Sequence, residues 1–92
     1  MLAEIRAETL VERLDEKIRV RADFGGGTLK PLVFMRRGQI HRVVKVNCYW
    51  MDREGNAKIH YFSVTSDSGD VYQIHFNSDD MVWHLDLVMV ES

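Results

Sequence analysis

The stretch IHYFSVTSDSGDVYQIHF, residues 59–76, alternates apolar and polar side chains on both sides of one turn. Phe62 and Val64 share one parity before the turn, and Tyr72, Ile74 and Phe76 share one parity after it. A period of two is typical of strands with one buried face. The sequence Asp-Ser-Gly-Asp between the two runs supplies residues that favour turns. This stretch therefore predicts an antiparallel β-hairpin.

The same pattern extends along most of the chain. Turn signals at residues 25–27, 37–38, 54–56, 67–70 and 77–80 separate six alternating runs. The other predicted inward rows are Ile18, Val20 and Ala22 in the first strand, Ile40, Val44, Val46, Cys48 and Trp50 in the third, and Trp83, Leu85, Leu87 and Met89 in the last. The second strand, residues 29–36, contains Pro31, which has no N–H to donate and so favours an edge position or a strand start. We expect a mainly β protein, a small SH3-like, partly open antiparallel barrel of five to six strands.

Residues 1–16 have a different composition. They contain no Gly or Pro and are rich in Ala, Leu, Glu and Arg, which favour helices. Leu10 and Leu14 fall on the more apolar face of the helical wheel, beside an acidic stripe whose like charges oppose an isolated helix. The sequence predicts an N-terminal helix over 1–16 and a β-barrel domain over 17–92. The helix would cover an end or edge of the barrel or reach out to a partner.

Length and composition favour one small domain in a reducing compartment. A chain of 92 residues forms a single core, and Cys48 is the sole cysteine, so no intrachain disulfide can form. The first 17 residues carry five acids and lack the apolar stretch of a signal peptide. No run approaches the length of a membrane helix. We expect a cytoplasmic, bacterial protein that does not enter membranes.

Charge is strongly segregated along the chain. Residues 17–58 carry ten Lys or Arg against three acids, and residues 59–92 carry six acids and no Lys or Arg, although the net charge is only −2. Segregated charge bears on partners more than on chemistry.

From Ile18 to Glu91 the order of features resembles a known family. It includes a basic opening strand, Pro31 followed by Phe34, and the turn at residues 36–39, and it continues with the Arg42–Val46 strand, Trp50, the runs 61–65 and 69–72, and Trp83. The chain is similar to a bacterial family of small uncharacterised β-rich domains, which also resembles a C-terminal segment of some polymerase-like proteins of the mutagenic DNA-damage response. It differs in its longer first turn and in Met35, where the family pattern has an aromatic residue before the Arg-Gly turn. The resemblance implies a fold and an association with DNA metabolism, and it transfers no catalytic residue.

The basic residues of the middle segment are the candidate binding surface. Arg19, Arg21 and Lys45 share the outward parity of their strands, and Tyr49 continues the row of Lys45 with an aromatic ring that could stack on a base. The candidate nucleic-acid-binding residues are Arg19, Arg21, Arg36, Arg37, Arg42, Lys45 and Tyr49, with Lys30 as a further cation. Three alternatives stay open: neutralisation by the acids of the same chain, phosphate binding, and an acidic protein partner. The isoelectric point near 6.0 counts against a dedicated nucleic-acid binder.

The sequence contains little that matches known catalytic or metal-binding motifs. The spacings of His41, His60, His75 and His84 match no zinc motif. Cys48 is predicted inward, where a thiol is usually an inert core residue. We expect no enzyme activity, no metal, no cofactor and no small-molecule substrate.

Several strands are apolar on both faces. Met51 follows Trp50, and Leu32 to Met35 form a continuous apolar run. Together with the N-terminal segment, these residues predict an interaction seam that includes Leu10, Leu14 and Met51, covered by the helix or by a second copy. The leading hypothesis is a non-catalytic interaction module, either self-associating or accessory to a larger complex. The alternative is single-stranded nucleic-acid binding through the basic strand face.

Overall fold

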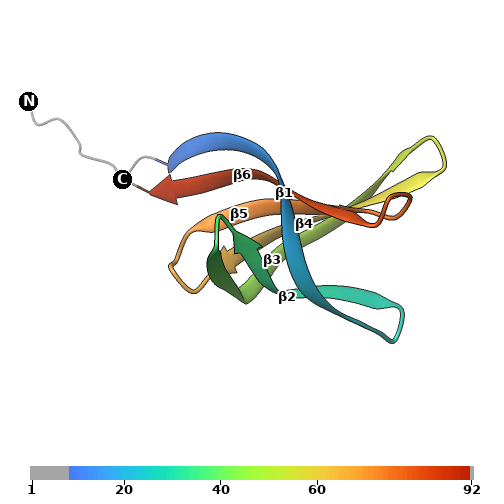
Figure 1. Ribbon diagram of the computed structural model, residues 1–92, viewed down its shortest axis with the longest axis horizontal. Helices are drawn as coiled ribbons and strands as arrows, with labels where there is room; N and C mark the ends of the chain where they lie inside the picture. Colours follow the sequence, from blue (N-terminus) through green and yellow to red (C-terminus); the bar gives the residue numbers. More distant parts are fainter. Residues whose placement is uncertain (1–8, 92) are drawn as a thin grey trace, which may run out of the picture.

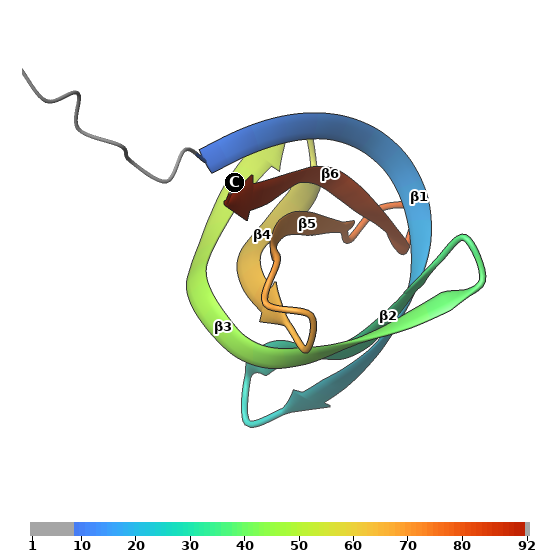
Figure 2. The ribbon, with the colours of Figure 1, turned by 90° about the vertical axis from the view of Figure 1, so that its left-hand side faces the viewer.

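The computed structural model describes residues 9–91, all of which lie in one antiparallel β-sheet or its turns (Figure 1). The strands are β1 (Thr9–Gly25), β2 (Thr28–Arg36), β3 (Gln39–Glu54), β4 (Ala57–Ser66), β5 (Val71–Asn77) and β6 (Val82–Glu91). Each strand pairs with the next one in sequence, and β6 pairs with β1, so the pairings close into a barrel. Figure 2 shows the strands curving around a common axis. The described part of the chain contains no helix that could cross a membrane.

Strand β1 is shared between two neighbours. Residues Thr9–Ile18 pair with β6, whereas Arg19–Gly25 pair with β2. Strands β2 and β3 pair only over Val33–Arg36 and Gln39–Arg42. As a result, the outer ends of β1 and β2 form a two-stranded ribbon that projects from the barrel (Figure 1). This divergence leaves long stretches of β1 and β3 paired on one side only.

The core lies between β4, β5, β6 and the middle of β1 and β2. Its most deeply buried apolar side chains are Phe34, Phe62, Val64, Ile74 and Leu85, each at 1% exposure or less. These residues come from the alternating rows of the sequence, because successive side chains of a strand point to opposite faces. The inward rows predicted for β4 and β5, and the inward row Ile18, Val20 and Ala22 of β1, are confirmed.

Three of the predicted turns are two-residue hairpins. Gly26 and Gly27 join β1 to β2, and Arg37 and Gly38 join β2 to β3, each pair with positive φ at both positions. Gly55, also at positive φ, begins the turn between β3 and β4. Such backbone conformations match the twist of the flanking strands and favour glycine.

The predicted helix over 1–16 is wrong where the structure describes it, since residues 9–16 belong to β1. Residues 1–8 lie outside the described residues. Pairing with β6 supplies hydrogen bonds that outweigh the helix propensity of this segment. A register shift between Arg13 and Glu16, with Asp15 at a φ of 47°, adds a bulge to the strand. Residues 9–16 are accordingly part of the sheet.

The predicted inward row of β3 is largely wrong. Val46 packs against the core, but Ile40, Val44, Cys48 and Trp50 are exposed. His41, predicted outward, stacks on the buried ring of Phe34, with ring centroids 4.9 Å apart. Register shifts at Val43/Lys45 and Val46/Cys48 divide the strand, because each bulge reverses the parity from one side of it to the other. The predicted even-numbered row faces the core only between the two bulges, at Val46, and odd-numbered residues face inward on either side.

A bulge also changes which residues of β6 face the core. Trp83 and Leu85 are buried as predicted, whereas Leu87 and Met89 are only partly buried and Val88 takes the core position. The shift arises at Asp86, since Ile74 pairs with Leu85 and Gln73 pairs with Leu87. Pro31 pairs with Ala22 of β1 and lies outside the β2–β3 pairing, in agreement with the edge position that its missing N–H predicts.

Candidate functional site

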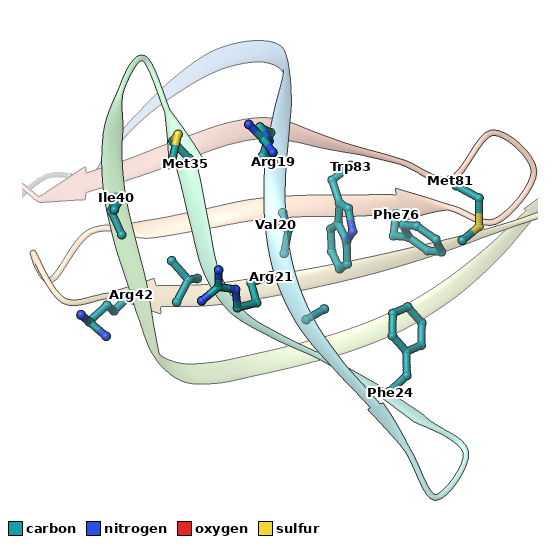
Figure 3. Close-up of a pocket in the computed structure, with 12 residues that line it drawn as sticks. Arg19, Val20, Arg21, Phe24, Met35, Ile40, Arg42, Phe76, Met81 and Trp83 are labelled. Carbon is teal, nitrogen blue, oxygen red and sulfur yellow. The ribbon is translucent and has the colours of Figure 1, made fainter.

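A groove of about 730 Å³ runs beside the part of β1 that leaves β6. Arg19 and Arg21 of β1 and Arg42 of β3 lie on one side, and Phe24, Phe76, Met81 and Trp83 lie on the other (Figure 3). The remaining lining residues are apolar: Val20, Ala22, Val33, Met35 and Ile40. Among the described residues, no acidic side chain lines this groove, which we call the arginine groove.

Strand register brings the three arginines together. Arg21 and Arg42 both face Val33 of β2, so they share one face of the sheet with one strand between them. Because neighbouring strands are about 4.8 Å apart, their Cα atoms lie roughly 10 Å from each other. Arg19 lies two residues before Arg21 on the same face, about 7 Å away along the strand. The three arginines therefore form one cluster.

These three arginines make no ion pair with a carboxylate among residues 9–91. The guanidinium of an exposed arginine offers up to five N–H donors to an anion. Since the groove also lacks acids, an anionic ligand would meet no repulsion from its walls.

The apolar side of the groove contains an exposed aromatic ring. Phe24 is 64% exposed and lies at the end of β1, and its ring centroid is 6.3 Å from that of Phe76 in an edge-to-face arrangement. Phe76 and Trp83 are nearly buried, with centroids 5.1 Å apart, and form a rigid base beneath it. Phe24 is thus held by packing on one side while the rest of its surface faces solvent.

Arg36 and Arg37, two of the predicted binding residues, are engaged by an acid of the same chain. The Arg36 Nε atom donates to Glu16 Oε1 at 2.6 Å, and Arg37 Nη2 donates to Glu16 Oε2 at 3.1 Å. The hydrogen bond with Glu16 raises the pKa of Arg36, and the Arg36 hydrogen bond holds the pKa of Glu16 below its ordinary value. Within residues 9–91, neutralisation by acids of the same chain therefore applies to this pair and not to the arginines of the groove.

Lys30, Lys45 and Tyr49 lie outside the arginine groove. Lys30 is on the projecting ribbon, opposite Asp23. Tyr49 does not continue the outward row of Lys45, because the bulge at Val46/Cys48 turns it to the face of Phe62, with ring centroids 5.1 Å apart. Its hydroxyl shares a hydrogen bond of 2.8 Å with His60 Nδ1. The predicted set therefore does not form one surface.

The predicted interaction seam is not one surface. Leu10 is exposed in β1, Leu14 packs against the core, and Met51 is exposed in β3, a strand that does not pair with β1. Met51 instead belongs to an exposed apolar stretch of β3 together with Tyr49 and Trp50.

The outer face carries a row of ring-bearing side chains across four strands. Trp50, Tyr61, His75 and His84 are successive cross-strand partners. His75 shares a hydrogen bond of 2.6 Å between its Nδ1 atom and Asp86 Oδ1, and Gln73 donates to the other oxygen of Asp86. Within residues 9–91, no group of three His, Cys, Asp or Glu side chains is arranged to hold a metal ion.

The sequence interpretation missed Phe24, Phe76 and Trp83 as groove residues. Phe76 and Trp83 were assigned to the core, which is where most of their surface lies. Phe24 continues the alternating row of Val20 and Ala22 just before three glycines, and an aromatic residue at the tip of a predicted hairpin is the available signal.

Comparison with known proteins identifies no relative: no protein-family model matches the chain, and no curated protein or solved structure is significantly similar to it.

Proposed function

We propose that this protein is a non-catalytic binding module that holds a single-stranded nucleic acid in the arginine groove. The observation that carries the proposal is the combination of Arg19, Arg21 and Arg42, none of them paired with a carboxylate within residues 9–91, with an exposed aromatic ring in the same groove. Small barrels commonly recognise single strands by such a combination of cations and stacking rings.

The arginines would contact the phosphates. Their arrangement along β1 and across β2 places three guanidinium-bearing residues on one face, with neighbouring Cα atoms about 7 and 10 Å apart. Guanidinium groups bind phosphate oxygens in a bidentate manner, which fixes the strand as well as attracting it. The low net charge of the chain does not oppose this, because the field near the groove is set by the local cluster and is screened beyond about 10 Å at moderate salt.

Phe24 would stack on a base. Its ring is accessible and braced by Phe76, and unpaired bases offer a free π-face that bases in a duplex do not. Stacking of this kind contributes about 1–3 kcal/mol per base and tolerates any sequence. The proposed ligand is therefore single-stranded and the recognition is largely independent of sequence.

The test is fluorescence anisotropy of a labelled single-stranded oligonucleotide at two salt concentrations. Three phosphate contacts predict a slope of log K against log salt of about −2, so affinity falls roughly 20-fold between about 50 and 200 mM salt. The triple variant Arg19→Ala/Arg21→Ala/Arg42→Ala should lose this binding. Arg13→Ala is the matched control, because Arg13 is an exposed arginine of β1 outside the groove.

Two results would contradict the proposal. One is the absence of binding by the wild-type protein at the lower salt concentration. The other is an equal loss of affinity in the triple variant and in Arg13→Ala, which would indicate attraction by general positive charge. Thermal unfolding followed by circular dichroism verifies that the triple variant remains folded.

A second candidate function is protein interaction, favoured by the exposed apolar residues of β3. In this second function, the domain would self-associate or act as an accessory to a larger complex. An SH3-like arrangement of the barrel and a role in bacterial DNA metabolism, inferred from the sequence resemblance, are compatible with both candidates. A cytoplasmic location remains part of the same proposal.

A further inference from the structure

The edge of β3 from Val43 to Glu54 has β4 on one side and no strand on the other within residues 9–91, because pairing with β2 ends at Arg42. Every residue from Asn47 to Glu54 is exposed. Unpaired N–H and C=O groups along an exposed strand are a template for another strand. Trp50 and Met51 add apolar surface at the centre of this edge.

Pairing with β4 shows which side chains of β3 share a face. Lys45, Cys48, Trp50, Asp52 and Glu54 lie on the outer face, since Trp50 is opposite the outward Tyr61. Val46, Tyr49, Met51 and Arg53 lie on the other face, since Tyr49 is opposite the buried Phe62. On the outer face, positive charge is at one end and negative charge at the other. Such a strand is complementary to itself in the antiparallel direction.

We propose that β3 binds β3 of a second copy of this chain, antiparallel, with the two-fold axis at Trp50. Counting along the ladder with β4, Lys45 then lies opposite Glu54 of the second copy and diagonal to its Asp52. Tyr49 lies opposite Met51 of the second copy on the other face, a favourable sulfur–aromatic contact. Both contacts occur twice, because a two-fold interface is isologous.

Neighbouring registers are less favourable. A shift of one pairing step puts residues of opposite faces against each other. If the two copies of β3 are shifted by two pairing steps in one direction, Lys45 has no opposite residue, because its position falls beyond Glu54, where the partner strand ends. The shift in the other direction requires pairing at Arg42, where β2 already occupies the edge. The bulges at Val43/Lys45 and Val46/Cys48 limit the regular pairing to the central stretch and so oppose addition of further strands.

Charge reversal tests the proposal. Light scattering after size exclusion, with protein at about 100 µM to favour weak interfaces, should give a dimer for the wild type. Lys45→Glu or Glu54→Lys alone places like charges opposite each other twice per dimer and should weaken dimerisation about tenfold or more. An equimolar mixture of the two variants should form a heterodimer, because both charge pairs are then opposite in sign. Lys17→Glu on β1 is the matched control and should dimerise as the wild type does.

The register is tested with cysteine. Cys48 is exposed and lies opposite Asp52 of the second copy, so Asp52→Cys should yield a covalent dimer under mild oxidation. The variant Asp52→Cys/Cys48→Ser should not. A monomeric wild type at this concentration, or single variants that dimerise unchanged, would overturn the proposal. None of these substitutions touches the arginine groove, so oligonucleotide binding and dimerisation can fail independently.

Discussion

Glu16 of β1 accepts hydrogen bonds from Arg36 at the end of β2 and from Arg37 in the following turn, at 2.6 and 3.1 Å. The side chains of Glu16 and Arg36 are only 23% and 20% exposed. This contact ties the β2–β3 turn to the bulged part of β1. It also removes two cations from the basic surface that the sequence indicated.

Glu16→Gln should make the stability of the protein less dependent on pH. The hydrogen bond from Arg36 keeps the pKa of Glu16 below its ordinary value of 4.5, so the ionised carboxylate stabilises the folded state fully above that value. The wild type should therefore be more stable than Glu16→Gln at neutral pH. The difference should disappear as the pH falls through the lowered pKa, as measured by urea unfolding at several pH values. A difference that persists unchanged at low pH would contradict the ion pair.

Truncation of Phe34 should mainly lower stability, whereas truncation of Phe24 should mainly lower oligonucleotide affinity. Phe34 is fully buried against His41 and Tyr72, so Phe34→Ala should lower the free energy of unfolding by about 3–5 kcal/mol. Phe24→Ala should cost much less stability but lower oligonucleotide affinity by about 1–3 kcal/mol through lost stacking. Phe24→Trp, which retains a ring, should keep the affinity. Chemical unfolding and anisotropy measure the two effects separately, and an unchanged affinity of Phe24→Ala would remove Phe24 from the ligand contact.

Asp86 should contribute to stability through its two partners. It accepts a hydrogen bond from Gln73 and shares one with His75, and its side chain is 15% exposed. Asp86→Ala leaves both partly buried partners unsatisfied and should lower the free energy of unfolding by about 1–3 kcal/mol. Asp79→Ala, at an exposed turn position, is the control and should change stability by less than about 0.5 kcal/mol. Equal effects of the two substitutions would show that the hydrogen bonds of Asp86 add nothing.

Gly38 should be far less tolerant of alanine than Gly25. A Cβ atom would meet no neighbour at either position, but Gly38 has a φ of +77°, whereas Gly25 is outside the positive-φ region. Gly38→Ala should therefore destabilise the protein by about 1–2 kcal/mol, and Gly25→Ala should have little effect. Thermal unfolding of both variants checks whether backbone conformation alone sets the cost, and similar melting temperatures would argue against it.

The local features of the fold were predictable from the sequence. Alternation in residues 59–76 and the outward parity of Arg19 and Arg21 depend on neighbours along the strand. The turn glycines act through their own backbone conformation. For the same reason, the basic character of the site could be predicted, and Arg19, Arg21 and Arg42 were among the named candidates.

Long-range pairing decided the rest. Residues 9–16 have the composition of a helix and become a strand because β6, roughly 70 to 80 residues later in the chain, supplies their hydrogen bonds. The bulges of β3, seen only in its register with β4, reverse its parity, so Trp50 is exposed and Tyr49 is turned away from the face of Lys45. The early end of the β2–β3 pairing opened the arginine groove and an edge of β3 that no strand of residues 9–91 covers. The sequence by itself thus determined the strands, their turns and the charge they carry, since these follow from residue conformation and periodicity. Only the tertiary structure decided which cations are neutralised and which surfaces remain open, because both depend on contacts between segments far apart in the chain.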